Sequence, residues 1–97
     1  MIEGKYLIKF NTPMGQISGN LELKVQNESL SGTLEIMGGK NNFYGGKVEG
    51  NKCIFSGEFN TPIGNIKYDI LGIVDEEKLS IYAETNKGRF KLEGTRI

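Results

Sequence analysis

Apolar and polar side chains alternate along nearly the whole chain. Between residues 17 and 25, Ile17, Leu21, Leu23 and Val25 occupy odd positions, and polar or charged residues occupy the even ones. A period of two is typical of antiparallel β-strands with one buried and one solvated face, and no segment sustains the period of a helix. The pattern predicts eight strands, at about 4–11, 16–26, 29–37, 42–49, 52–60, 65–74, 78–85 and 88–96.

Two Thr-Pro-x-Gly segments, at residues 12–15 and 61–64, are the clearest turn signals. Proline presets the φ angle of the second turn position, and glycine accepts the left-handed conformation that follows. Both prolines of the chain lie in these segments, so every predicted strand keeps its backbone hydrogen-bond donors. We therefore predict a tight hairpin at each of them.

These turns belong to an internal repeat. Residues 10–17 read FNTPMGQI and residues 59–66 read FNTPIGNI, so six of eight positions are identical at an offset of 49 residues. The later segments KVEG (47–50) and KLEG (91–94) are similar at an offset of 44, which predicts extra residues in the first copy at 37–42. The repeat indicates duplication of a four-strand unit, at about 4–50 and 53–97, with two structurally equivalent halves.

The 97 residues are enough for one domain, and their short sequential hairpins favour an up-and-down meander. Eight such strands can close and leave no exposed edge. We therefore predict an all-β fold in a single domain, an eight-stranded antiparallel up-and-down β-barrel. Inward glycines at positions 19, 32, 57 and 72 would permit the coiling that closure requires. A two-sheet β-sandwich with the same meander is the alternative.

Charge and composition exclude several classes of function. Twelve basic residues balance twelve acidic ones, so the chain lacks the basic surplus of nucleic-acid or membrane-surface binders. It has no histidine and one cysteine, Cys53, which removes the common nucleophile pairs and histidine-based metal sites. We predict no cofactor, and an enzyme of unusual type is the least favoured alternative. The single cysteine and a start unlike a signal peptide predict a cytoplasmic location.

The loops that share one end of the meander are a first candidate site. Both Thr-Pro-x-Gly turns and the loops at 37–42 and 86–88 fall at this end. Barrel mouths commonly bind ligands, so one hypothesis is a small polar or anionic ligand, and the other is simply good turn residues. The candidate ligand-binding residues here are Asn11, Lys40, Asn42, Asn60 and Asn86, with Asn41 and Lys87 beside them.

The barrel interior is a second candidate site. Eight strands enclose a space that side chains can just fill, or that holds one small ligand. Tyr6 and Tyr68 fall on the predicted inward face, where a buried phenol needs a partner from a ligand, the backbone or water. The inward phenylalanines favour solid packing, and these are Phe10, Phe55, Phe59 and Phe90.

An apolar patch on the outer face is a third candidate site. Ile54, Leu71, Ile73 and Tyr82 interrupt the polar pattern on three successive strands. Simple hairpin registers place Ile54, Leu71 and Tyr82 side by side. At the positions equivalent to Leu71 and Ile73, the first copy of the repeat has charged residues. A contiguous apolar cluster predicts an interface, such as that of a homodimer, and harmless surface is the alternative.

The turn motifs also carry a resemblance to a known group. The paired Thr-Pro-x-Gly turns, the hairpin at 48–52 (VEGNK) and the ending at 93–96 (EGTR) resemble small bacterial β-barrel domains of uncharacterised function. Such domains stand alone or are appended to larger enzymes, including oxidoreductases, and the resemblance implies the fold without any catalytic residue. The meander is also similar to calycin-like barrels of the streptavidin and lipocalin type, which implies ligand binding by analogy.

Two functions from different classes follow from these features. The first is a non-enzymatic small-molecule-binding β-barrel that uses the amide-rich mouth together with Tyr6 and Tyr68. The second is an oligomerisation or protein-interaction module that acts through the outer apolar patch. No nucleic-acid or membrane partner is expected.

Overall fold

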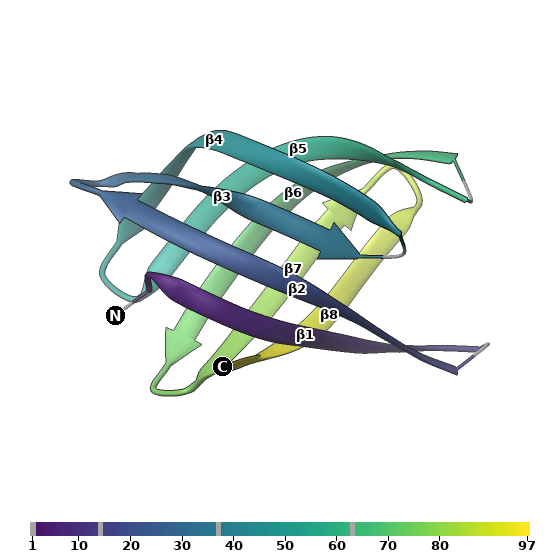
Figure 1. Ribbon diagram of the computed structural model, residues 1–97, viewed down its shortest axis with the longest axis horizontal. Helices are drawn as coiled ribbons and strands as arrows, with labels where there is room; N and C mark the ends of the chain where they lie inside the picture. The colour runs from purple at the N-terminus through teal and green to yellow at the C-terminus, as the bar shows by residue number, and fades with distance from the viewer. Residues whose placement is uncertain (1, 14, 37, 63) are drawn as a thin grey trace.

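The computed structural model describes residues 2–13, 15–36, 38–62 and 64–97, without the side chains of Thr12 and Phe59. Met14 and Ile63 in the Thr-Pro-x-Gly segments, and Met37 at the end of a predicted strand, lie outside the described residues, as does the side chain of the predicted inward Phe59. Eight strands make up almost all of the described chain (Figure 1). They are β1 Gly4–Thr12, β2 Gly15–Gln26, β3 Ser29–Ile36, β4 Gly39–Glu49, β5 Lys52–Thr61, β6 Gly64–Asp75, β7 Lys78–Thr85 and β8 Gly88–Arg96.

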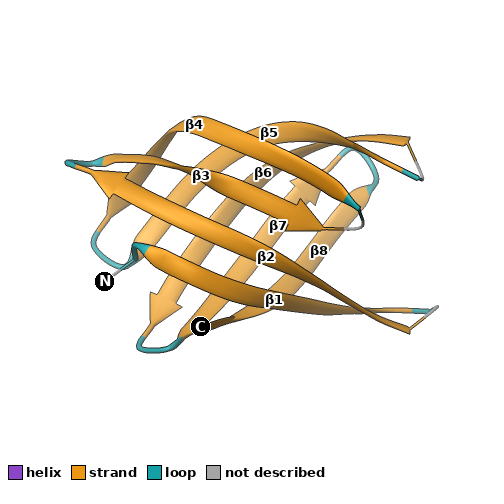
Figure 2. Cartoon of the chain, in the orientation of Figure 1, coloured by secondary structure: helices purple, strands orange, loops and turns teal. Residues whose placement is uncertain are grey.

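The strands form a closed barrel in which each strand pairs antiparallel with the next and β8 pairs with β1. The predicted up-and-down barrel is confirmed, and the sandwich alternative is wrong. Strands joined by short links form the whole wall (Figure 2). The links β1–β2, β3–β4, β5–β6 and β7–β8 lie at one end, which we call the mouth. The remaining links and both chain termini lie at the other end, which we call the base (Figure 1).

The two Thr-Pro-x-Gly hairpins extend furthest at the mouth, on opposite sides of it (Figure 1). Gly15 and Gly64 have φ angles of 119° and 109°, in the region that favours glycine. Thr61 Oγ1 donates a hydrogen bond of 2.9 Å to the Gly64 carbonyl oxygen. Backbone pairing continues to the last residue of each hairpin ladder. The predicted role of the two glycines is therefore confirmed.

Strand register corrects the later part of the repeat. Gly39 pairs with Ile36, and Gly88 pairs with Thr85, so these positions correspond at the same offset of 49 as the earlier ones. The offset of 44 for the KVEG and KLEG segments is therefore wrong, and the β3–β4 link is as long as the β7–β8 link. The lengths of the copies differ by one residue inside β4, where a β-bulge interrupts the pairing with β3.

The bulge in β4 reverses which residues face inward. Leu30 pairs with Gly46 and Gly32 pairs with Phe43, so two residues of β4 oppose one residue of β3. Gly45 occupies the bulge with a φ of 75°. Phe43 therefore faces the core and Tyr44 faces solvent, although strict alternation counted back from Val48 would place them the other way round.

The two copies meet at two seams that have few backbone pairs. β4 pairs with β5 over three residue pairs, and β8 pairs with β1 over four. Ladders inside each copy have seven to ten. Both seams are paired toward the base, so the rest of each seam has few backbone hydrogen bonds.

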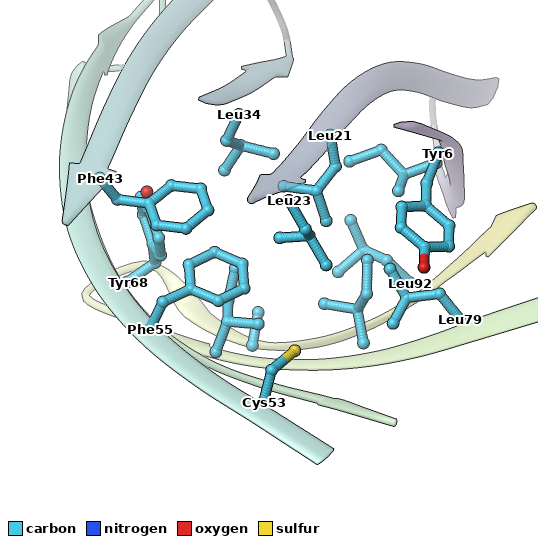
Figure 3. Close-up of a cluster of buried hydrophobic side chains, with 14 of the residues drawn as sticks. Tyr6, Leu21, Leu23, Leu34, Phe43, Cys53, Phe55, Tyr68, Leu79 and Leu92 are labelled. Carbon is cyan, nitrogen blue, oxygen red and sulfur yellow. The ribbon is translucent and has the colours of Figure 1, made fainter. Parts of the chain in front are cut away.

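Buried apolar side chains gather in the base half of the interior, and Figure 3 shows part of the core cluster to which they belong. The Phe43 and Phe55 rings stack with centroids 4.0 Å apart, and Cys53 lies in the same cluster. Ile2, which precedes the first strand, is only 4% exposed and belongs to the same buried core. Burial of this apolar cluster supplies the main stabilisation of the fold.

Candidate functional site

The mouth half of the interior is hollow. A cavity of about 480 Å³ lies there, walled by apolar side chains of β1, β2, β3, β6, β7 and β8. Its volume falls in the ordinary range of small-molecule pockets, about 300–1,000 Å³. The expected solid packing therefore holds only for the base. We call this space the mouth cavity, and its wall includes Ile8, Ile17, Leu34, Ile66, Ala83 and Phe90.

Two features of the second copy leave this space unfilled. Ala83 faces inward at the position where the first copy has the larger Leu34. Phe90 packs against Phe10, with ring centroids 6.1 Å apart, and stays 41% exposed. The rings of Phe10 and Phe90 therefore lie in the wall of the cavity and do not fill it.

Tyr68 is the predicted site residue that lines the mouth cavity. Its hydroxyl donates a hydrogen bond of 2.5 Å to Asn41 Oδ1, so a β6 side chain reaches β4 across β5. Gly57 of β5 makes room for this contact, because a Cβ there would lie 2.5 Å from both atoms. Burial raises the pKa of Tyr68 to about 12, so the phenol stays neutral at ordinary pH.

Tyr6 lies at the base, in the cluster of Figure 3, and does not line the mouth cavity. Its hydroxyl donates a hydrogen bond of 2.6 Å to the Ile2 carbonyl oxygen. The Arg96 guanidinium lies 4.9 Å from the centre of the Tyr6 ring. Burial raises the pKa of Tyr6, and the positive charge of Arg96 opposes that rise. The two predicted tyrosines therefore occupy opposite ends of the barrel, and Tyr6 holds the N-terminal segment.

The predicted amide cluster lies at the mouth end but outside the cavity wall. Asn11, Asn42 and Asn60 each accept a hydrogen bond through Oδ1, from Gln16, Thr33 and Asn65 respectively. Lys40 is exposed on β4 next to Asn41, whose partly buried amide is the one that meets Tyr68. The hydrogen bonds of these amides thus lie within the turns and the barrel wall.

Asn86 extends the barrel wall beyond the end of β7. Its Oδ1 accepts a hydrogen bond of 2.9 Å from the Lys67 backbone N–H, and its Nδ2 donates one of 3.1 Å to the Asn65 carbonyl. The Asn86 backbone N–H also donates to the Lys67 carbonyl. Both ends of this side chain are thus occupied by β6, so its place in the structure is that of a turn anchor.

The outer patch has the geometry that the hairpin registers predicted. Ile54, Leu71 and Tyr82 pair across β5, β6 and β7, and they are 50%, 38% and 43% exposed. Ile73 is half-buried and lies nearer the base. Tyr44, which the bulge turns outward, is 77% exposed and lines the same outer groove of about 540 Å³. The sequence analysis missed Tyr44, and the Gly-Gly pair beside it was the available signal.

Little reactive chemistry accompanies these surfaces. Burial raises the pKa of the Cys53 thiol, against a smaller lowering by a hydrogen bond with the Gly72 backbone, so it is a protonated core group. Within the described ranges, no three Cys, Asp or Glu side chains gather as metal ligands, and no helix is long and apolar enough to cross a membrane. The arrangement can hold an apolar molecule, and Cys53 is not activated as a nucleophile.

Lys87 is the charged residue at the mouth cavity. Among the described residues that line the cavity, it alone carries a charge, while Tyr68 and Thr85 contribute polar hydroxyls. The mouth cavity is an almost wholly apolar space that opens at the mouth, whereas the outer groove also has the charged residues Lys47, Asp69 and Glu84 in its wall. No protein-family model, curated protein or solved structure matches the chain.

Proposed function

We propose that this protein is a non-enzymatic binding protein that holds one small, mainly apolar molecule in the mouth cavity. The observation that carries the proposal is an apolar space of about 480 Å³ inside a closed barrel. A void of this size deprives its wall of packing contacts, and the wall offers water few polar partners. An apolar ligand would restore those contacts and remove apolar surface from water.

The polar groups near the cavity support an apolar ligand rather than the small polar one. Tyr68 already donates to Asn41, and the mouth amides are engaged in the outer wall. Among the described residues, no buried side-chain nitrogen or oxygen lacks a hydrogen-bond partner. The interior therefore has no unmet polar requirement that a sugar or nucleotide would fill.

Filling the cavity tests the proposal. The native protein is expected to bind the uncharged fluorophore N-phenyl-1-naphthylamine, with enhanced emission, and Ala83→Phe is expected to weaken binding at least about tenfold. The new ring would occupy space that the ligand needs, in a position where the first copy already carries Leu34. Because the ring enters an existing void, thermal stability should be unchanged or higher.

The matched control is Glu35→Phe, which places the same ring on the exposed outer face beside Leu34. This variant should bind the fluorophore as the native chain does. The proposal fails if the native protein does not bind the fluorophore, or if the two variants lose affinity equally.

A second candidate function, self-association, rests on the outer patch. We propose that a second copy of the chain covers Ile54, Leu71 and Tyr82. The proposal is supported by their alignment on three neighbouring strands, with the exposed Tyr44 lining the same groove. Contiguous exposed apolar groups of this kind commonly mark interfaces, and aromatic residues are enriched there.

Leu71→Glu tests self-association. The repeat-equivalent position in β2 holds Glu22, so the strand accepts this side chain, and the charge should weaken a dimer at least about tenfold. Sedimentation equilibrium over a concentration series measures the change, and Ile97→Glu, at an exposed residue outside the patch, is the control. A native chain that stays monomeric throughout would contradict this proposal and leave the binding function untouched.

A further inference from the structure

Lys87 places a single positive charge at the rim of the mouth cavity. It lies in the β7–β8 link, and its backbone N–H donates a hydrogen bond of 2.9 Å to Thr85 Oγ1, which fixes the local turn. Its side chain reaches the β5–β6 hairpin, because Lys87 Nζ lies 3.7 Å from the position that a Cβ on Gly64 would take. The ammonium group therefore extends from one mouth link to another.

Within the part of the chain that the structure describes, no acidic side chain pairs with the charge of Lys87. Its neighbour Arg89, by contrast, forms an ion pair with Glu84 at 3.3 Å on the exposed surface. Lys87 is an exposed residue that nevertheless lines a mainly apolar wall. Lysine side chains commonly lie this way, with the stem on apolar surface and the ammonium in water.

The deep part of the mouth cavity is apolar, and the charge of Lys87 lies at the rim of the cavity. Its deeper wall includes Ile8, Leu21 and Leu92, and the packed cluster of Phe43 and Phe55 closes the interior toward the base. No buried polar side-chain atom of the described residues is left without a partner. A ligand's polar group therefore belongs at the rim, and its apolar part belongs inside.

We propose that the ligand is an amphiphile with one acidic head group, whose apolar tail fills the mouth cavity and whose head pairs with Lys87. This inference rests on the proposed binding function and adds the chemical class of the ligand to it. A carboxylate is the simplest head with this chemistry, and a sulfonate, a sulfate monoester or a phosphate monoester would also present negative charge to the ammonium. Because the pair lies at the solvent boundary, water and salt weaken it, so its effect on affinity is moderate.

The experiment compares three ligands that share one tail. Dodecanoate, 1-dodecanol and dodecylammonium displace N-phenyl-1-naphthylamine from the native protein at pH 8, in low salt and below micelle-forming concentrations. Dodecanoate should bind about three- to tenfold more tightly than dodecanol, and dodecylammonium should bind more weakly than dodecanol. This order should shrink in high salt, as expected of a partly exposed charge pair.

Lys87→Met removes the charge and keeps a stem of similar shape. In this variant dodecanoate should lose its advantage over dodecanol, and continued binding of the uncharged fluorophore would show that the cavity is intact. Lys40→Met is the matched control, since it removes a mouth-end lysine that does not line the cavity. Equal affinity of acid and alcohol in the native protein, or an acid preference that survives Lys87→Met, would overturn the head-group inference alone. Failure of the fluorophore and of all three ligands to bind would overturn the binding function itself.

Discussion

Replacement of Gly32 by alanine is expected to destabilise the barrel by about 3 kcal/mol or more. A Cβ at this inward position of β3 would overlap the carbonyl oxygen of Glu22 and lie 2.8 Å from Phe43 Cζ. The first obstacle is backbone of the neighbouring strand, which cannot rotate away as a flexible side chain can. Equilibrium unfolding in urea gives the loss directly, and a domain of this size has only about 5–15 kcal/mol in total.

Gly94→Ala is the matched control for Gly32→Ala. Gly94 also faces inward, but the atoms nearest to an added Cβ would belong to side chains, Ile8 Cγ2 at 3.2 Å and Leu79 Cβ at 3.3 Å. A small shift relieves such contacts, and alanine restricts the unfolded chain, so the net loss should stay below about 1 kcal/mol. Equal losses in the two variants would mean that close approach of β2 to β3 is not what requires glycine at position 32.

The inward glycines also explain why two similar sequences do not form two identical halves. At the offset of 49, Gly19 corresponds to Tyr68, and Gly32 corresponds to Ile81. Gly57 and Gly72 likewise correspond to Ile8 and Leu23. Each of these glycines thus has a large residue at the equivalent position of the other copy. In β3 and β4, Gly32 pairs with Phe43, whereas Ile81 pairs with the smaller Leu92 in β7 and β8. The sizes of pairing residues are thus redistributed, so the two halves share an order of strands and differ in their interior.

Much of the architecture could be predicted from the chain because it depends on local signals. Alternation defines strands, Thr-Pro-x-Gly defines two hairpins, and the repeat implies equivalent halves. The β4 strand was harder, because the left-handed Gly45 adds one residue and moves Phe43 inward. A Gly-Gly pair inside a strand is a signal for a bulge, but it does not say which residue bulges.

The candidate site was less predictable because it depends on distances between strands that are far apart in sequence. Tyr6 and Tyr68 both read as inward phenols, yet only register and strand direction place one at the base and the other at the mouth. Partnerships such as Tyr68 with Asn41 join residues 27 positions apart. Composition also gave no sign of an interior half filled and half hollow, since the same phenylalanines can plug a barrel or line its wall.

Replacement of Phe55 by alanine is expected to cost about 3–5 kcal/mol, the usual loss for a large buried aromatic residue. Phe55 is 4% exposed, stacks on Phe43 and meets the Tyr68 ring edge-on with centroids 6.2 Å apart. It lies at the β4–β5 seam, which has only three backbone pairs. The substitution should therefore lower the stability of the whole fold and also loosen the β4–β5 seam in particular. Hydrogen exchange of the amides that pair β4 with β5 should accelerate more than exchange of the amides that pair β5 with β6 in the longer ladder.

Phe90→Ala removes the same ring from a more exposed place and is the control. Phe90 is 41% exposed and meets Phe10 at the rim, so its loss should destabilise by less than about 2 kcal/mol. Equal losses, or uniform acceleration of exchange around the wall after Phe55→Ala, would show that the seam needs no side-chain support. The repeat gives a reason to expect otherwise. Tyr6 occupies the position equivalent to Phe55, at the β8–β1 seam, which has four backbone pairs. Both sparsely paired joints of the barrel thus have a buried aromatic residue in the same place, so we infer that closure depends on packing where backbone hydrogen bonds are fewest.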